Sequence, residues 1–293
     1  MFIATLIAAD RLTEQCVLAA GRLLMQAGCG PDRFEWLEPG SAATIAFQWQ
    51  FQRARDALHS ALEGVDAVVQ SAGAPDRSLL IADMDSTMIT VECIDELADY
   101  AGLKAEVATI TERAMRGELD FERALDERVR LLAGMDAAAI DRCREERVRL
   151  TPGAKILVRT MKARGAASIL VSGGFTRFAE PVAAEIGFDR VVANELEIGD
   201  GRLTGRVSRP LVGAAAKREA LLAAARELGI GIQETLAVGD GANDIPMLEA
   251  AGLGIAYRAK PAARAAADAA IDHNDLTALL YAQGIPKSQW VTD

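Results

Sequence analysis

The chain has 293 residues, which is enough for two domains of about 100–200 residues each. Hydrophobic residues make up 51% and charged residues 25%, a balance that excludes disordered and fibrous chains. Its 32 basic and 42 acidic residues give a formal charge of −10, so no overall basic field would attract DNA or RNA, and we expect no nucleic-acid partner.

The start of the chain, residues 1–10, has no basic segment and reaches an acid at Asp10, which argues against a secretory signal. Charged residues interrupt each apolar stretch before the roughly 18 residues that a membrane helix needs. We therefore expect a cytoplasmic protein with no membrane partner.

The first part of the chain, about residues 1–72, is expected to be a domain of its own. Its apolar spacing predicts the order βαββαβ, which is the ferredoxin-like arrangement of two helices on an antiparallel sheet. The expected elements are a strand at 2–8, a helix at 13–27, extended runs at 33–38 and 41–48, a helix at 50–62 and a strand at 65–70. Turn-forming residues at 71–77 predict a linker.

From residue 78 to the end, strands alternate with helices, which predicts a doubly wound, Rossmann-like α/β core. The expected strands are 79–83, 167–172, 190–194 and 235–240, and the expected helices are 153–164, 176–186, 215–228, 244–250 and an Ala-rich segment at 262–270. Residues 195–207 alternate around Asp200-Gly201, which predicts a hairpin. Residues of about 92–150 have helical character without a strand pattern and predict an inserted helical cap.

Cysteine and histidine are too scarce to suggest their usual chemistry. The cysteines form no C-x-x-C pair, and they are expected to be small hydrophobic residues in a reducing compartment. The histidines lack metal-ligand spacing and are expected at the surface or in packing. Chemistry in this chain would therefore depend on carboxylates. The cysteines are Cys16, Cys29, Cys93 and Cys143, and the histidines are His59 and His273.

The segment Asp83-Met84-Asp85-Ser86-Thr87 follows a strand that is expected to be buried on both faces. Open α/β sheets bind ligands at the carboxyl ends of their strands, where a carboxylate can act as a nucleophile. The alternative is that these residues cap the following helix, but a cap explains Asp85 or Ser86 and gives no reason for Asp83.

A second acidic cluster, residues 239–244, also follows a predicted strand. If the two strands are neighbours, Asp240 lies beside Asp83, and paired carboxylates near a phosphate indicate Mg²⁺. An Asp-Gly turn in solvent is the alternative for one isolated cluster. Between the clusters, Ser172-Gly173-Gly174 offers a hydroxyl and backbone N–H groups to phosphate, and Lys217 offers a fixed positive charge, although turns and solvated lysines of this kind are common.

Taken in this order, the four segments resemble the motifs of the haloacid dehalogenase-like phosphohydrolases, and in particular the members that act on phosphoserine. The pattern D-x-D-S-T stands at 83–87, and a glutamate follows the first aspartate by nine positions, at Glu92. Residues 113–121 with Arg128 resemble that family's cap. The match spans roughly residues 78–280; Met84, where many members carry Phe, departs from it.

The resemblance implies that Asp83 attacks the phosphorus of O-phospho-L-serine to form an aspartyl-phosphate, while Asp85 serves as acid and then as base. It also implies Mg²⁺ held by Asp83, the backbone carbonyl of Asp85, and Asp240. The remaining implied roles are phosphate binding by Ser172, Gly173 and Lys217, binding of the substrate's ammonium by Glu92 and of its carboxylate by Arg128, and support from Asn243 and Asp244.

Two other functions remain open at this point. The same aspartyl-phosphate could transfer its phosphoryl group to another alcohol, and a non-catalytic serine sensor would bind the ligand without turnover; a sensor is disfavoured because Asp83, Asp85, Lys217 and Asp240 are all present. The N-terminal βαββαβ unit is similar to the amino-acid-sensing ACT-like domains attached to some bacterial members. It implies either regulation by serine at the interface of a homodimer or passive dimerisation.

Overall fold

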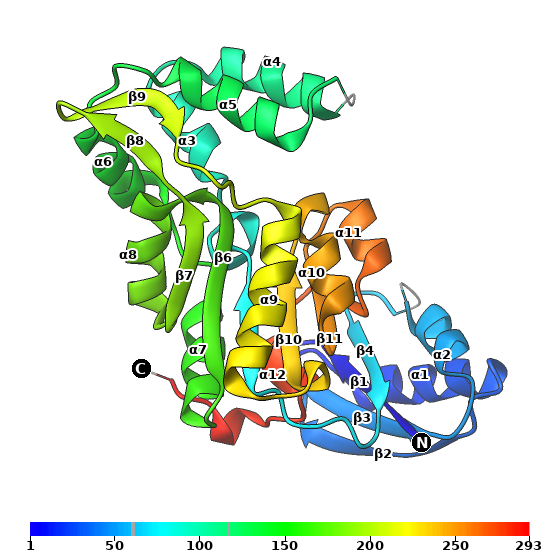
Figure 1. Ribbon diagram of the computed structural model, residues 1–293. Helices are drawn as coiled ribbons and strands as arrows, with labels where there is room; N and C mark the ends of the chain where they lie inside the picture. The colour runs from blue at the N-terminus through cyan, green and yellow to red at the C-terminus, as the bar shows by residue number, and fades with distance from the viewer. Residues whose placement is uncertain (60–61, 116–117, 293) are drawn as a thin grey trace.

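The computed structural model describes residues 1–59, 62–115 and 118–292. Residues 60–61 of the helix expected at 50–62 and residues 116–117 of the segment 113–121 therefore lie outside the described residues. An N-terminal unit, a central α/β unit and a set of helices above it follow one another in space (Figure 1). No helix in the described parts of the chain is long and apolar enough to cross a membrane.

The N-terminal unit has the predicted element order and a four-stranded antiparallel sheet in the order β2-β3-β1-β4. Its elements are β1 (Phe2–Ile7), α1 (Glu14–Gln26), β2 (Pro31–Glu38), β3 (Ala42–Phe47), α2 (Phe51–Leu58) and β4 (Asp66–Ser71). Alternate residues of the strands, such as Leu6 and Ile45, pack with Val17 and Leu24 of α1 in a separate core. The sheet therefore buries one face under its own helices.

The central unit is a six-stranded parallel sheet in the order β12-β11-β10-β5-β6-β7. Its strands are β5 (Leu79–Ala82), β6 (Ala167–Phe175), β7 (Arg190–Asn194), β10 (Thr235–Gly239), β11 (Leu253–Tyr257) and β12 (Ala269–Ile271). Its helices are α7 (Ala154–Ala163), α8 (Thr176–Ile186), α9 (Ala214–Leu228), α10 (Ile245–Ala250), α11 (Pro261–Ala266) and α12 (Ala278–Ala282). The predicted α/β fold class is confirmed.

The strand sequences explain the three layers. Successive side chains of a strand point to opposite faces, so a strand buried on both faces needs a continuous apolar run. In β5, Leu80 packs in the cluster that contains α7 and α8, whereas Leu79 and Ile81 pack in the cluster that contains α9 and α10. Figure 1 shows α7 and α8 on one side of the sheet and α9 on the other.

Among the described residues, four α-helices lie between β5 and α7, where the sequence predicts an insertion. They are α3 (Cys93–Tyr100), α4 (Lys104–Met115), α5 (Phe121–Leu131) and α6 (Ala138–Arg147). The predicted hairpin is present as β8 (Leu196–Gly199) and β9 (Arg202–Val207), and it lies beside α5 (Figure 1). The N–H of Gly134 donates to the carbonyl of Leu203 over 2.8 Å, so the hairpin is attached to the inserted helices.

The N-terminal unit is joined to the central unit through a buried carboxylate. Asp66, at the start of β4, accepts backbone N–H groups of Asp272, His273 and Asn274 at 2.9–3.3 Å. The side chain of Asn274 donates to Asp66 Oδ2 (2.7 Å) and to the carbonyl of Ile7 (3.0 Å). Asp66 is therefore the centre of a polar junction between the two units.

The Ala-rich segment departs from the sequence prediction. The helix expected at 262–270 ends at Ala266, and residues 269–271 form β12, which pairs in parallel with β11. The prediction was wrong there because the pairing with β11 outweighs the helix propensity of alanine, which is a small energy per residue. As predicted, the four cysteines are free, with Cys29, Cys93 and Cys143 buried, and both histidines are exposed.

Candidate active site

The two acidic clusters lie at the ends of neighbouring strands. β5 and β10 pair in parallel, with Ala82 opposite Val238, so Asp83 and Asp240 leave the sheet at the same edge. The N–H of Asp83 donates to the carbonyl of Val238 over 3.0 Å, which fixes the spacing of the two strand ends. This edge is where open parallel sheets place their ligands.

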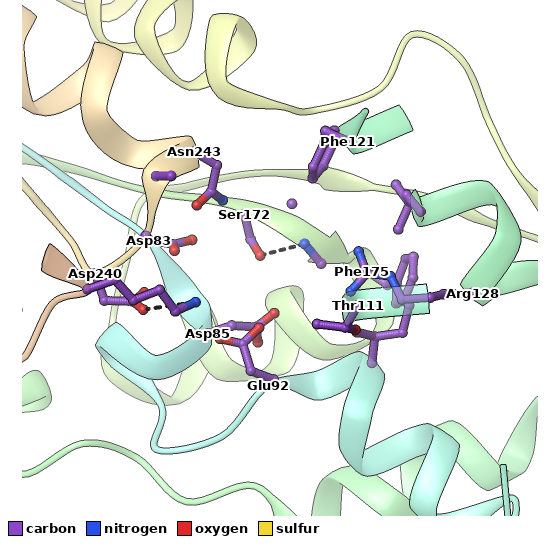
Figure 2. Close-up of a pocket in the computed structure, with 17 residues that line it drawn as sticks. Asp83, Asp85, Glu92, Thr111, Phe121, Arg128, Ser172, Phe175, Asp240 and Asn243 are labelled. Atoms are coloured by element: carbon purple, nitrogen blue, oxygen red, sulfur yellow. Dashed lines mark hydrogen bonds and ion pairs between the residues drawn. The ribbon is translucent and has the colours of Figure 1, made fainter. Parts of the chain in front are cut away.

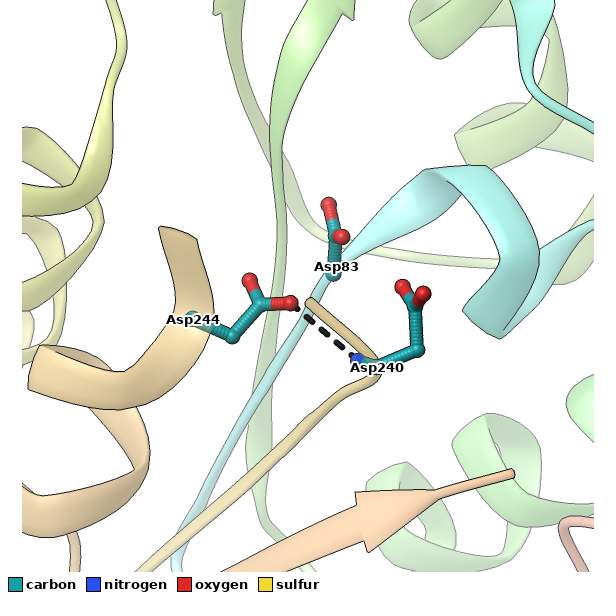
Figure 3. Close-up of side chains that lie close together, drawn as sticks. All are labelled: Asp83, Asp240 and Asp244. Atoms are coloured by element: carbon teal, nitrogen blue, oxygen red, sulfur yellow. Dashed lines mark hydrogen bonds between the residues drawn. The ribbon is translucent and has the colours of Figure 1, made fainter. Parts of the chain in front are cut away.

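Three carboxylates meet at this edge. Oxygens of Asp83, Asp240 and Asp244 lie within 4.8 Å of one another, and all three residues are buried (Figure 3). The ammonium of Lys217, on α9, lies 2.6 Å from Asp83 Oδ1 and 2.7 Å from Asp244 Oδ1, and its side chain is fully buried. Three carboxylates against one ammonium leave a formal charge of −2.

The electrostatics of this cluster suit a divalent cation. Burial raises the pKa of Asp83 well above its usual range, with Lys217 acting against that rise. Burial, and then the neighbouring charge of Asp244, raises the pKa of Asp240 to about 6. Hard carboxylate oxygens are the ligands that Mg²⁺ prefers, and its charge would offset the excess of two negative charges. The residues present therefore fit the predicted ion.

The three carboxylates differ in how many of their oxygens are engaged. Asp244 accepts Lys217 on Oδ1 and the N–H groups of Asp240 (3.1 Å) and Gly241 (2.9 Å) on Oδ2. Among the described residues, the Asp240 carboxylate contacts only the hydroxyl of Thr87 (3.4 Å) and the ammonium of Lys260 (4.0 Å). Asp244 is thus suited to orient the loop, and Asp240 to bind a metal.

Asp83 also has one engaged and one open oxygen. Its Oδ1 accepts the ammonium of Lys217 and the N–H of Met84 (2.8 Å), while its Oδ2 has no hydrogen-bond partner among the described residues. The sequence analysis considered that Asp85 or Ser86 caps the segment that follows the strand. In the structure, Asp83 makes this capping contact, with the N–H of Met84. Because Oδ2 is not used in that contact, the cap leaves an oxygen available for chemistry.

Asp85 lies two residues farther along a tight turn, and it points toward the inserted helices rather than into the carboxylate cluster. Its Oδ1 accepts the N–H of Cys93 over 3.4 Å, and Figure 2 shows it beside Glu92. Burial, and then the charge of Glu92, raises the pKa of Asp85 to about 7. A carboxyl group of this kind holds a proton close to neutral pH, which general acid catalysis needs.

A cavity of about 360 Å³ opens over these residues, between the sheet edge and the inserted helices. Figure 2 shows Asp240 and Arg128 at opposite ends of it, with Ser172 between them. The lining includes the predicted residues Asp83, Asp85, Glu92, Arg128, Ser172, Gly173, Asp240 and Asn243. One cavity therefore brings together residues of both acidic clusters, of the C-terminal end of β6 and of α5.

Hydrogen bonds fix Glu92 and Arg128, the two side chains at the end of the cavity opposite Asp240. The hydroxyl of Ser86 donates to Glu92 Oε1 over 2.8 Å, and Arg128 Nε donates to the carbonyl of Ala124 over 3.2 Å. Burial lowers the pKa of the Arg128 guanidinium, and the charge of Asp95 opposes that shift. Glu92 and Arg128 present opposite charges to the same space.

The end of β6 extends three residues beyond the predicted strand 167–172, so Gly173 and Gly174 lie in the strand, and close packing shapes this segment. Phe121, the first residue of α5, lies 3.4 Å from the place that a Cβ on Gly173 would occupy, and 3.2 Å from that on Gly213. Asn194 donates to the carbonyl of Gly173 (2.8 Å) and accepts the N–H of Val212 (2.8 Å). A Cβ at Gly213 would therefore be tight against the ring of Phe121, whereas a Cβ at Gly173 would make an ordinary van der Waals contact with it.

Two outcomes differ from the sequence analysis. Lys217, expected to reach the substrate, does not line the cavity; it lies behind Asp83 with its ammonium bonded to two carboxylates. Thr87 was part of the motif at 83–87 but had no role, and Lys260 was not singled out, yet both lie beside Asp240. The apolar run of β11 predicts a strand end three residues before Lys260, and that pattern could have identified it.

Comparison with known proteins identifies the family to which the chain is similar. A model of the haloacid dehalogenase-like hydrolase family matches residues 80–249. The chain is 42% identical over 285 residues to a phosphoserine phosphatase of Streptomyces coelicolor, covering 95% of this chain and 69% of that protein. It is 47% identical over 232 residues to a phosphoserine phosphatase of Mycobacterium tuberculosis, covering 78% of this chain and 56% of that protein.

A solved structure agrees with these relatives. A probable phosphoserine phosphatase from Vibrio cholerae superposes with a TM-score of 0.77 at 34% sequence identity, covering 96% of this chain and 88% of that one. The similarity thus includes the N-terminal unit as well as the central one. In length, the chain spans little more than half of the Mycobacterium relative.

Proposed function

The chain belongs to the haloacid dehalogenase-like hydrolases, and from this premise we propose that it is a phosphoserine phosphatase. It hydrolyses O-phospho-L-serine to L-serine and phosphate, as the last step of serine biosynthesis. The observation that carries the proposal is the open Oδ2 of Asp83 at the end of a cavity that also holds Glu92 and Arg128.

In the first step, Asp83 Oδ2 attacks phosphorus, and the bond from phosphorus to the serine oxygen breaks. Asp85 gives its proton to that oxygen, so serine leaves as an alcohol. In the second step, Asp85 takes a proton from water, which attacks the aspartyl-phosphate and releases phosphate and free Asp83. The raised pKa of Asp85 supports the first of these proton transfers.

Mg²⁺ would be held by Asp83, Asp240 and the backbone carbonyl of Asp85, and when bound it supplies positive charge beside the phosphoryl oxygens. The hydroxyl of Ser172 and the N–H of Gly173 donate to those oxygens, and Asn243 adds a polar contact from the opposite wall. Lys217 acts from behind: it holds Asp83 Oδ1 and so aims Oδ2 into the cavity.

Selectivity for an amino acid comes from the other end of the cavity. Glu92 pairs with the substrate's ammonium, and Arg128 with its carboxylate through two parallel hydrogen bonds. The inserted helices, residues 92–150, act as a cap over the substrate, with Phe121 against Gly173. Closure excludes water from the first step.

For the N-terminal unit, residues 1–72, we propose an ACT-like role in a homodimer, with serine as its regulatory ligand. The ferredoxin-like order of its sheet supports this role. Light scattering of the full chain tests for the dimer, and phosphate release measured with and without serine tests for regulation. We expect a dimer whose activity changes when serine is added. An unresponsive dimer would leave only passive assembly.

The deciding experiment measures phosphate release from O-phospho-L-serine with and without Mg²⁺, for the wild type and Asp83→Asn. We expect Mg²⁺-dependent release in the wild type and a loss of roughly 10⁴-fold or more in the variant, the scale of removing a covalent nucleophile. Adding glycerol as an acceptor separates hydrolysis from phosphoryl transfer, since transfer would yield glycerol phosphate. Retained activity in Asp83→Asn would remove the proposed nucleophile.

A further inference from the structure

The charges that line the cavity are unevenly placed. Its lining carries four carboxylates, and among the described residues only Arg128 and Lys260 line it with positive charge. Arg128 lies at the end opposite Asp240 (Figure 2), and the ammonium of Lys217 is bonded to Asp83 and Asp244 behind the wall. At the end where the phosphate must lie, Lys260 is thus the one described side-chain cation that faces the cavity.

The backbone of Lys260 is fixed beside the carboxylate cluster. Its N–H donates to the carbonyl of Asp240 over 2.9 Å, and its own carbonyl accepts the N–H of Arg264 over 3.0 Å. It immediately precedes Pro261, the first residue of α11, and a proline there has a backbone angle suited to starting a helix. The Cα of Lys260 is therefore held in register with the end of β10.

The side chain of Lys260, by contrast, is weakly held. It is 60% exposed, and its nearest charged partner among the described residues is Asp240 Oδ2 at 4.0 Å, beyond hydrogen-bond distance. Such a side chain moves at little cost, and a compact ammonium on a flexible stem suits phosphate oxygens. A fixed backbone and a mobile ammonium allow the side chain of Lys260 to move with an anion that enters the site.

We propose that Lys260 is a phosphate-positioning residue whose ammonium turns from Asp240 to an oxygen of the incoming phosphomonoester and binds free phosphate in the same way. This inference rests on the proposed phosphatase activity. It acts on the phosphate alone, so it assists phosphomonoesters of any alcohol, whereas Arg128 selects the amino-acid part. It also offsets the repulsion between a dianion and a chain of formal charge −10.

The test compares Lys260→Ala and Lys260→Arg with the wild type at saturating Mg²⁺. Loss of one charge-assisted hydrogen bond predicts that KM for phosphoserine and the inhibition constant of inorganic phosphate both rise about 10-fold in Lys260→Ala. The turnover number changes less, and Lys260→Arg recovers most of the loss. With p-nitrophenyl phosphate, which lacks the amino-acid groups, Lys260→Ala has the same effect as with phosphoserine.

Lys104→Ala is the matched control, since it removes an equal charge from a side chain 72% exposed on α4. It should leave both constants at the wild-type values. An unchanged inhibition constant for phosphate in Lys260→Ala would overturn the proposal, and so would a shift only in the Mg²⁺ concentration for half-maximal activity, because Lys260 would then act through Asp240. If the wild type itself released no phosphate from phosphoserine, the proposed function would fail first.

Discussion

The ammonium of Lys217 lies 2.6 Å from Oδ1 of Asp83, and neither side chain has appreciable contact with solvent. The two residues are 134 positions apart and come from different elements, β5's end and α9. Their contact turns a helix lysine, which is usually solvated, into the counter-charge of a buried acidic cluster.

Replacing Lys217 by Met should destabilise the fold as well as stop catalysis. The variant leaves Asp83 and Asp244 buried without a counter-charge, and breaking such a pair costs about 3–5 kcal/mol of unfolding free energy. Urea denaturation in the absence of metal measures this loss. Lys104→Met, which breaks only a solvent-accessible ion pair with Asp99, should leave the urea midpoint close to that of the wild type. Equal midpoints for Lys217→Met and the wild type would contradict the buried-pair account.

Binding of Mg²⁺ should stabilise the protein through the same cluster. At an ion concentration 100 times its Kd, one site adds about 2.7 kcal/mol to the free energy of unfolding. Differential scanning fluorimetry should show the melting temperature rising with Mg²⁺ and falling back with EDTA. Asp240→Asn removes one carboxylate ligand and should abolish most of the rise. A wild type insensitive to both treatments would mean that the cluster holds no divalent ion.

Arg128→Ala should separate the two ends of the substrate. Loss of a bidentate pair with the substrate carboxylate is expected to raise KM for phosphoserine about 100-fold. Hydrolysis of p-nitrophenyl phosphate, which has no carboxylate, should change only a few-fold. Arg123→Ala, on the exposed face of the same helix, serves as control. If both substrates lost activity equally, Arg128 would be supporting the cap rather than binding the carboxylate.

Asp66→Ala should loosen the junction between the N-terminal and central units. Removing this carboxylate leaves the backbone N–H groups of residues 272–274 and the side chain of the buried Asn274 without this acceptor, at a cost of about 2–4 kcal/mol. Limited trypsin digestion should then cut faster at Arg77 in the linker, whose side chain is buried in the intact protein. Asp76→Ala, next to that site and 91% exposed, should digest like the wild type.

Asp189 should make stability depend on pH in the acid range. Burial acts to raise its pKa, but hydrogen bonds from Lys162 (2.7 Å) and from Ser168 (2.8 Å) outweigh burial and lower it. The carboxyl group of Asp189 therefore binds its proton more tightly in the unfolded chain than in the folded one. Its contribution to the free energy of unfolding is full above a pH of about 4 and is lost as the pH falls below that value. The side chain is 40% exposed, so screening limits the effect to about 0.5 kcal/mol.

Urea midpoints of the wild type and Asp189→Asn at several pH values test this. The wild type should be the more stable at pH 7, and the difference should shrink as the pH approaches 3.5. If the difference in urea midpoint between the two proteins stayed constant with pH, the lower stability of Asp189→Asn would come from packing and not from charge.

Local patterns predicted most of the central unit. The apolar run of β5 followed by Asp83, and that of β10 followed by Asp240, identify buried strands with carboxylates at their ends. Such patterns depend only on neighbours along the chain, so they were sufficient for the fold class. They failed at residues 269–271, where alanine favours a helix and only the presence of β11 makes a strand.

The sequence by itself determined which residues stand at the strand ends and what chemistry their oxygens and nitrogens allow. Only the tertiary structure decided that Lys217 is bonded behind Asp83, that Lys260 faces the cavity instead, and that Asp66 joins residues more than 200 positions away. The physical reason is that periodicity reports which face of an element is buried. The partners across that face depend on the order of the strands and on packing between distant segments, which no local repeat specifies.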